Sequence, residues 1–208
     1  MADFLPGCTA ISEIGNIVGQ MQFFERLISD GDSTIIIDLS HRVFRDFFLV
    51  VHKIGFFEEA RRRSVEPVIL FIVDQDPKAA KAYAILRRWF SDVALIPLRN
   101  QKSAAGMRFL EKFPLSSAVP LSVEVPVLSP ALTAVVDQPS FSFLQFWNRS
   151  MERLPDHLDD ELRHWMKRVL LQFRQIELCV FCDGILSSLF SKDPARGGTG
   201  LQGDSERS

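Results

Sequence analysis

Three continuous apolar runs, separated by helical patterns, limit the folds open to this chain more than any other feature. The runs cover residues 33–39, 67–74 and 93–98 and are rich in Ile, Val and Leu. Such runs are typical of strands buried on both faces of a parallel sheet. Apolar residues at three- and four-residue spacing indicate helices at 11–29, 43–63 and 77–90. This alternation predicts an α/β protein with a mostly parallel, doubly wound sheet flanked by helices.

The third run carries Pro97, which cannot donate a backbone hydrogen bond, so it is the weakest of the three predicted strands unless it lies at a sheet edge or ends there. The later pattern predicts a helix near 104–112, a short strand at 120–126, short helices at 129–136 and 141–149, and a long helix at 156–190 that could break at Gly184. We expect one α/β domain over residues 1–190, with 150–190 as its C-terminal helical part. The Gly-, Ser- and Asp-rich stretch 191–208 is predicted to be a disordered tail. Truncation after Ser191 is predicted to leave the melting temperature nearly unchanged.

Charge and composition exclude several classes of protein. The formal net charge is -2, so no general attraction to anionic lipid is expected, and nucleic acid is not predicted as a partner. No apolar run is long enough to span a bilayer, and the first residues show no signal peptide. The three cysteines, Cys8, Cys179 and Cys182, do not form a disulfide framework, which favours a reducing compartment. Together these features predict a cytoplasmic protein.

Polar residues follow each of the predicted strands. Asp38, Asp74 and Asn100 stand at or just after the three strand ends, and Ser40, His41, Asp76 and Arg99 lie close to them in the sequence. In open parallel sheets, ligands bind beyond the carboxyl ends of the strands. The sequence therefore predicts any ligand site at this edge of the sheet.

Four motifs occur along the chain in a recognisable order. They are Ile35-Ile36-Ile37-Asp38, Val73-Asp74-Gln75-Asp76-Pro77, Leu95-Ile96-Pro97-Leu98-Arg99-Asn100, and the segment from Val125 to Leu132. In this order, over roughly residues 3–150, the chain resembles the later part of a ParA/MinD-type partition and positioning ATPase. The resemblance implies that Asp38 organises Mg²⁺ and the attacking water, that Asn100 contacts the base, and that Asp74 lies at the nucleotide site. It also implies ATP and Mg²⁺ as cofactors.

One essential motif of such ATPases has no counterpart in this sequence. Nothing matches G-x-x-x-x-G-K-[ST], and the Gly-rich piece 197–200 lies in a polar tail without a preceding strand. Phosphoryl transfer depends on the positioning and charge that this loop supplies. The resemblance therefore implies a front-truncated member that lacks the first strand, loop and helix, and a non-catalytic interaction or regulatory module. The alternative is an ATP hydrolase of that family whose phosphate loop is lost by truncation or supplied in trans, with Asp38 as its candidate catalytic residue.

Each candidate residue also has a purely structural interpretation. Asp38 could cap the turn after its strand, and Asn100 could be a turn residue. Asp74 and Asp76 could form an acid–base pair, but capping of the helix that begins near Pro77 is favoured.

Two further clusters are interpreted as structural. His157, Glu161 and His164 share one helical face, but they flank an apolar stripe, so a solvated face is favoured and no metal site is predicted. The pair Cys179 and Cys182 is expected to be buried and structural.

Phenylalanine dominates the aromatic residues, with 18 Phe and 1 Tyr. The predicted helix at 43–63 is apolar around most of its circumference, and it ends in three arginines that suit the negative end of its dipole. Either this helix is covered on both sides within the domain, or one side meets another chain. On this basis a homodimer or a complex with a protein partner is predicted.

Overall fold

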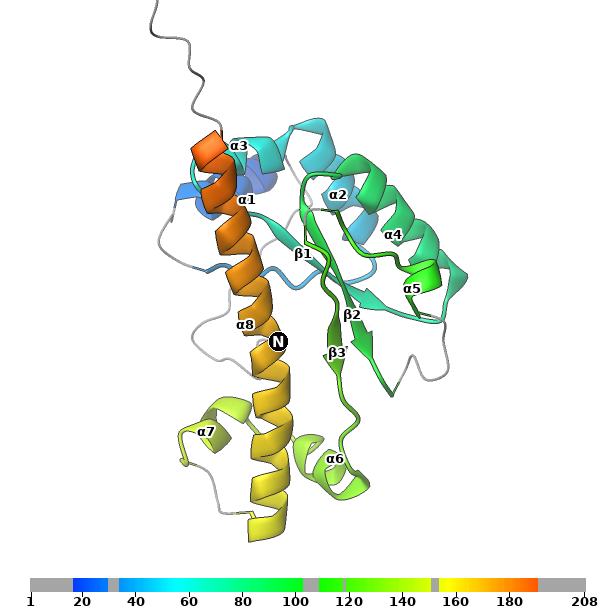
Figure 1. The fold of residues 1–208 in the computed structure, drawn as a ribbon, viewed down its shortest axis with the longest axis vertical. Coiled ribbons are helices and arrows are strands. Elements are labelled where there is room, and N and C mark those ends of the chain that lie inside the picture. Colours follow the sequence, from blue (N-terminus) through cyan, green and yellow to red (C-terminus); the bar gives the residue numbers. More distant parts are fainter. Residues whose placement is uncertain (1–16, 30–33, 103–108, 118, 151–153, 191–208) are drawn as a thin grey trace, which may run out of the picture.

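The computed structural model describes residues 17–29, 34–102, 109–117, 119–150 and 154–190. Its elements follow in the order α1 (Ile17–Ser29), α2 (Phe44–Lys53), α3 (Phe56–Arg62), β1 (Val68–Val73), α4 (Pro77–Trp89), β2 (Ala94–Asn100), α5 (Phe109–Lys112), β3 (Val123–Val125), α6 (Pro130–Val136), α7 (Phe143–Trp147) and α8 (Asp156–Phe190) (Figure 1). The expected segments 11–16 and 103–108, the tail 191–208 and Cys8 lie outside the described residues.

The three strands form a small open sheet that is parallel throughout. Their order is β1-β2-β3, with Val68 opposite Ala94 and Leu98 opposite Val123. Helices α2 and α4 lie on one face of this sheet, and α8 runs along the other face (Figure 1). The fold is therefore mixed α/β with helices on both faces of the sheet, as the alternating pattern predicts.

Strand β2 is the central strand and continues past Pro97 to Asn100, so it is neither an edge strand nor a strand that ends at its proline. The Gln101 N–H donates to the Val125 carbonyl at 3.1 Å, which places the odd-numbered amides of β2 on the β3 side. Pairing with β3 begins only at Leu98. Pro97 therefore faces β3 just before that pairing starts, and its missing N–H removes no bond of the ladder.

The predicted strand at 33–39 is absent over its described part, 34–39, and this is the main correction to the expected sheet. Residues 34–40 form no strand, and Ile36 is 72% exposed. Leu39 alone packs against the main core, as a half-buried side chain. A run of β-branched residues indicates a preference for extended backbone, but a strand also needs a hydrogen-bonded neighbour and cover on both faces. Within the described residues this segment has neither.

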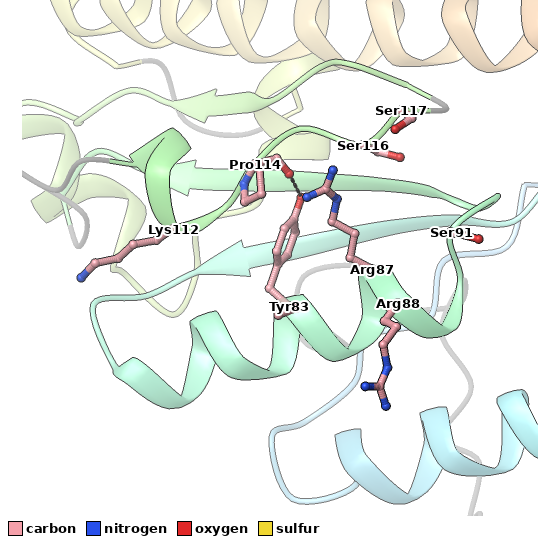
Figure 2. A pocket seen from close by; sticks show the side chains of 9 residues that line it. Tyr83, Arg87, Arg88, Ser91, Lys112, Pro114, Ser116 and Ser117 are labelled. Carbon is pink, nitrogen blue, oxygen red and sulfur yellow. Dashed lines mark hydrogen bonds between the residues drawn. The ribbon is translucent and has the colours of Figure 1, made fainter.

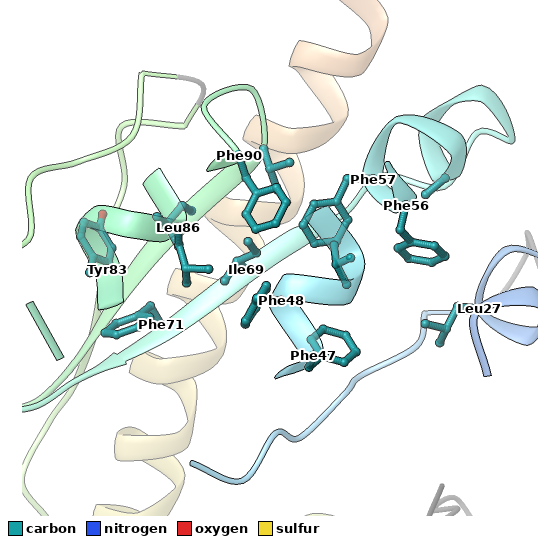
Figure 3. Packing of buried hydrophobic residues seen from close by; sticks show 14 of the residues in the cluster. Leu27, Phe47, Phe48, Phe56, Phe57, Ile69, Phe71, Tyr83, Leu86 and Phe90 are labelled. Atoms are coloured by element: carbon teal, nitrogen blue, oxygen red, sulfur yellow. The ribbon is translucent and has the colours of Figure 1, made fainter. Parts of the chain in front are cut away.

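The Phe-rich segment forms two helices instead of the single predicted one. Gly55 separates α2 from α3 with a φ of +62°, and its N–H donates to the His52 carbonyl at 3.4 Å. Only glycine adopts this left-handed conformation without steric cost. The bend allows Phe47 and Phe48 of α2 and Phe57 of α3 to point into one core (Figure 3).

That core is closed within the chain. Rings from α1, α2 and α3 pack with those of β1 and α4, and the Phe57 and Phe90 ring centroids lie 4.8 Å apart. Of the two alternatives, the structure supports the one in which the Phe-rich segment is covered by other elements of the same chain. Phe47, Phe48, Phe56 and Phe57 are buried in this way, whereas Ile54 of the same segment is exposed.

Helix α8 builds two smaller cores along its length. Ile176 packs with Ala94, Ile96 and Val123 against the sheet. Nearer its N-terminus, α8 packs against α6 and α7 around the buried side chain of Leu162. The helix continues through Gly184 without a break, and in the described part of the chain no helix is long and apolar enough to cross a membrane.

Candidate functional site

The carboxyl edge of the sheet brings together two of the three predicted site residues. Val73 lies opposite Arg99 in the register, so Asp74 and Asn100 stand at the ends of neighbouring strands. Neighbouring strands are about 4.8 Å apart. Asp38 is not among them, because its exposed side chain lies on the segment 34–40, which pairs with no strand of this sheet. The expectation that Asp38 ends a strand of the same sheet is wrong.

The polar residues at this edge make local hydrogen bonds to the backbone. Asp76 caps α4, since its Oδ1 accepts the Lys78 N–H at 2.8 Å. The Oδ1 of Asp74 accepts the Gln75 N–H at 2.5 Å. The Oδ1 of Asn100 accepts the Lys102 N–H at 2.9 Å. Asp76 therefore caps the helix as expected, and Asn100 makes the expected turn contact. Asp74 was also expected to cap this helix, but its Oδ1 binds the N–H of the next residue instead.

A polar crosslink joins β2 and β3 at the same edge. Arg99 and Gln101 both bind the Glu124 carboxylate, through Nη1 at 3.1 Å and Nε2 at 3.1 Å respectively. No local pattern predicts this cluster, because Glu124 is distant from β2 along the chain.

The histidine and cysteine clusters both lie on α8. His157, Glu161 and His164 are all exposed on α8, as predicted for a solvated face. The described residues contain no group of three or more His, Cys, Asp or Glu that could hold a metal ion. Cys179 is half-buried against the α8 core, whereas Cys182 is exposed, so the expectation of two buried cysteines is right only in part.

Arg61 has a role that sequence reasoning missed. It binds the Asp92 carboxylate and the Asp92 carbonyl, the latter at 2.6 Å, and it pairs with Glu66 at 3.2 Å. Burial opposes the charge of this guanidinium, but the hydrogen bond and the charges of Asp92 and Glu66 outweigh it and raise the Arg61 pKa. Arg61 therefore ties α3 to the loop before β2 instead of only ending a helix.

A cavity of about 390 Å³ lies between α4 and the loop after α5 (Figure 2). Its lining residues are Tyr83, Ala84, Arg87, Arg88, Ser91, Lys112, Pro114, Ser116 and Ser117. This lining contains three cations and no acid. The cavity is on the flank of α4, away from the strand ends where the sequence predicted a site.

Tyr83 joins the two walls of this cavity. Its hydroxyl donates to the Pro114 carbonyl at 2.8 Å (Figure 2). Burial raises the Tyr83 pKa, while the charge of Arg87 acts in the opposite direction. Sequence reasoning did not single out this residue, although it is the one Tyr in a chain with 18 Phe. A single tyrosine hydroxyl among so many phenylalanine rings is the sequence feature that could have indicated this cavity.

The two edge strands of the sheet differ in whether a side chain binds their outward-facing backbone groups. At β3, the Gln172 side chain binds the outward-facing N–H and carbonyl of Glu124, both at 2.7 Å. At β1, the described residues provide no further strand. Helix α8 covers one face of the sheet over β2 and β3. On the same face of β1, Val68, Leu70 and Ile72 are 37%, 42% and 69% exposed. We call these three side chains the β1 strip.

Comparison of the chain with protein families, with curated proteins and with solved structures finds no match. The family relationship that the motif order suggests thus rests on the sequence pattern alone.

Proposed function

We propose that this chain is a non-catalytic interaction module that pairs with a second copy of itself through β1. The observation that carries the proposal is the contrast between the two sheet edges. Gln172 occupies the outward backbone groups of β3, whereas β1 presents its edge and three exposed apolar side chains. An exposed, uncharged edge strand is a template for pairing with another chain.

The sequence of β1 favours a second copy as the occupant. Residues 68–73 contain no charged side chain, so two copies meet without repulsion inside the strand. In an antiparallel pair about a two-fold axis, Leu70 lies opposite Leu70 and Val68 lies opposite Ile72 of the other copy. The two β1 strips then form one apolar surface, which α8 of each copy borders.

Acidic residues at the two ends of β1 weakly oppose the pairing of two copies. In the same register, Glu66 stands opposite Asp74 of the other copy, and like charges across a ladder are destabilising. The Glu66 carboxylate already pairs with Arg61 at 3.2 Å, which offsets part of this repulsion. Full burial of a Leu or Ile side chain contributes about 1.5–3 kcal/mol, so the apolar contact outweighs the end charges.

The oligomeric state tests this proposal. Sedimentation of the full chain across a concentration series should show a monomer–dimer equilibrium. Leu70→Lys places two ammonium groups opposite each other on the axis and should give a monomer. Leu178→Lys is the matched control, because Leu178 is an exposed leucine of α8 outside the β1 strip, and it should leave the dimer intact.

Cross-linking provides a second readout that does not depend on affinity alone. In a background without Cys8, Cys179 and Cys182, Leu70→Cys should form a disulfide between copies under mild oxidation, because Cα atoms opposite each other on antiparallel strands are about 4.5–5.5 Å apart. Leu178→Cys should not. A wild-type monomer at all concentrations, or a dimer that Leu70→Lys leaves unchanged, contradicts the proposal.

The second candidate function is nucleotide binding by a relative of the ParA/MinD-type ATPases. The observation that favours it is the position of Asp74 and Asn100 at neighbouring strand ends. Calorimetry with ATP and Mg²⁺ tests this candidate: micromolar binding that Asp38→Ala abolishes would support it.

A further inference from the structure

The cavity beside Tyr83 has an unusual balance of charge. Arg87, Arg88 and Lys112 contribute to its lining, and no Asp or Glu does. Among the ion pairs formed within the described part of the chain, none involves these three cations. Arg61, Arg99 and Arg163, by contrast, are each held by a carboxylate. The Arg88 guanidinium points away from the loop, so the charge argument depends on Arg87, whose guanidinium lies beside the Tyr83 hydroxyl (Figure 2). A concave surface with such a guanidinium and no acid attracts anions.

Hydroxyl groups add hydrogen-bonding capacity to the same surface. Ser91, Ser116 and Ser117 line the cavity beyond Arg87 along α4 (Figure 2). Ser116 is only 5% exposed. Hydroxyls and guanidinium N–H groups together are the donors that protein sites use for phosphate oxygens.

Tyr83 fixes the shape of the cavity and adds no negative charge to it. Its hydrogen bond to Pro114 holds the loop 113–117 against α4. A phenol is neutral at physiological pH, and burial raises the pKa of Tyr83 further from that range. The cavity therefore has one wall of helix and one wall of loop, tied together by a neutral donor.

The two arginines of α4 point in different directions. Figure 2 shows the Arg87 guanidinium beside the Tyr83 hydroxyl and the Pro114 carbonyl, inside the space between helix and loop. It shows the Arg88 guanidinium on the opposite side of α4, away from that loop. A planar guanidinium can bind two phosphate oxygens at once, so Arg87 is placed to hold an anion and Arg88 is not.

We infer that this cavity binds the phosphate group of a small phosphate ester, with Arg87 as the principal ligand and the serine hydroxyls as further donors. Its volume of about 390 Å³ lies within the usual range for small-molecule sites. Ala84 and Pro114 supply apolar surface for the part of the molecule that carries the phosphate. This site is independent of the β1 strip and of the strand ends.

Titration of the isotope-labelled full chain with inorganic phosphate and with glycerol 3-phosphate, followed by NMR, tests the inference. Both probes should give saturable shifts at Tyr83, Arg87 and Ser116, with tighter binding of the ester. Arg87→Gln should weaken binding at least about tenfold, because the charge-assisted hydrogen bonds that it removes are roughly twice as strong as neutral ones. Arg88→Gln removes the same charge one residue away and should change affinity less than about threefold, as expected for an exposed charge.

Arg87→Lys separates geometry from charge. It keeps the cation but loses the planar fork, so its affinity should fall between those of the wild type and Arg87→Gln. Thermal melting of each variant checks that the fold is retained. Equal losses in Arg87→Gln and Arg88→Gln would mean general charge attraction and would overturn the inference. So would the absence of saturable shifts, or a phosphoserine peptide that binds far more tightly than glycerol 3-phosphate.

Discussion

Gln172 of α8 makes two hydrogen bonds to the backbone of Glu124 in β3. Its Nε2 donates to the Glu124 carbonyl at 2.7 Å, and its Oε1 accepts the Glu124 N–H at 2.7 Å. A neighbouring strand would make the same pair of bonds. One side chain thus closes this edge of the sheet and fixes α8 along β3.

Replacing Gln172 should destabilise the fold. Gln172→Ala leaves two half-buried backbone groups of Glu124 without their side-chain partner, so we expect a loss of about 1–3 kcal/mol in the free energy of unfolding. Urea denaturation measures this loss. Gln175→Ala is the control, because Gln175 is exposed on the same helix, and it should change stability by less than about 0.5 kcal/mol. Equal effects of the two variants would show that the edge bonds are unimportant.

Gly55 should tolerate few replacements. Its φ of +62° costs about 1–2 kcal/mol for a residue with a Cβ, although the added atom itself would only meet Glu58 Oε2 at 3.4 Å, an ordinary contact. Gly55→Ala should therefore lower stability by that amount through the backbone alone. Gly55→Asn should cost less, because Asn visits the left-handed region more readily. If both variants unfold at the wild-type denaturant concentration, the turn between α2 and α3 is not under this constraint.

Sequence patterns correctly predicted those elements that depend only on residues adjacent in the chain. The β1 run and the α4 pattern, with Asp76 as its cap before Pro77, are found in the structure as expected. A cap and a helical period are properties of adjacent residues, so one sequence contains all the information. The position of β2 in the centre of the sheet is not such a property, because it depends on where β3 begins to pair.

The errors arise where the partner is distant in the chain. The segment at Ile36 has the composition of a buried strand, but no described residue pairs with it. The cavity unites Tyr83 of α4 with Pro114 of a loop thirty-one residues later. Neither the missing strand partner nor the contact between helix and loop produces a pattern among neighbouring residues of the sequence. Composition alone offered a clue to Tyr83, and the open β1 edge could be recognised only once the order of the strands was known.

Glu59 should make the fold sensitive to acid. Its hydrogen bond to Arg63 is the main cause of a lowered Glu59 pKa, and Arg62 adds to it. A carboxylate whose pKa is lower in the folded state stabilises the fold above its unfolded pKa, and that contribution disappears as the pH falls through the folded value. Glu59→Gln should lower the melting temperature slightly at pH 7, and the difference from wild type should shrink below pH 4.5, the ordinary value for this group.

The control for this experiment is Glu161→Gln, which removes a charge from an exposed position on α8. Its difference from wild type should not follow the same pH profile. A Glu59→Gln difference that stays constant from pH 7 to pH 3 would show that the contacts with Arg63 and Arg62 do not stabilise the fold.

ATP should bind weakly, and Asp38 should not govern whatever binding occurs. The sequence has no phosphate loop, and Asp38 is exposed on a segment that pairs with no described strand. Asp74 and Asn100 direct their Oδ1 atoms to the backbone of their own turns. Calorimetry with ATP and Mg²⁺ should therefore detect no micromolar binding.

Two variants separate the routes by which ATP could still bind. Phosphate held in the cavity of Tyr83 would be lost in Arg87→Gln and retained in Asp38→Ala, because only Arg87 lines that cavity. Nucleotide held at the strand ends with Mg²⁺, as the resemblance to ParA/MinD-type ATPases implies, would show the reverse. Micromolar binding that Asp38→Ala abolishes would overturn the non-catalytic proposal, since it would require the segment 34–40 to join the sheet and present its carboxylate to the metal ion.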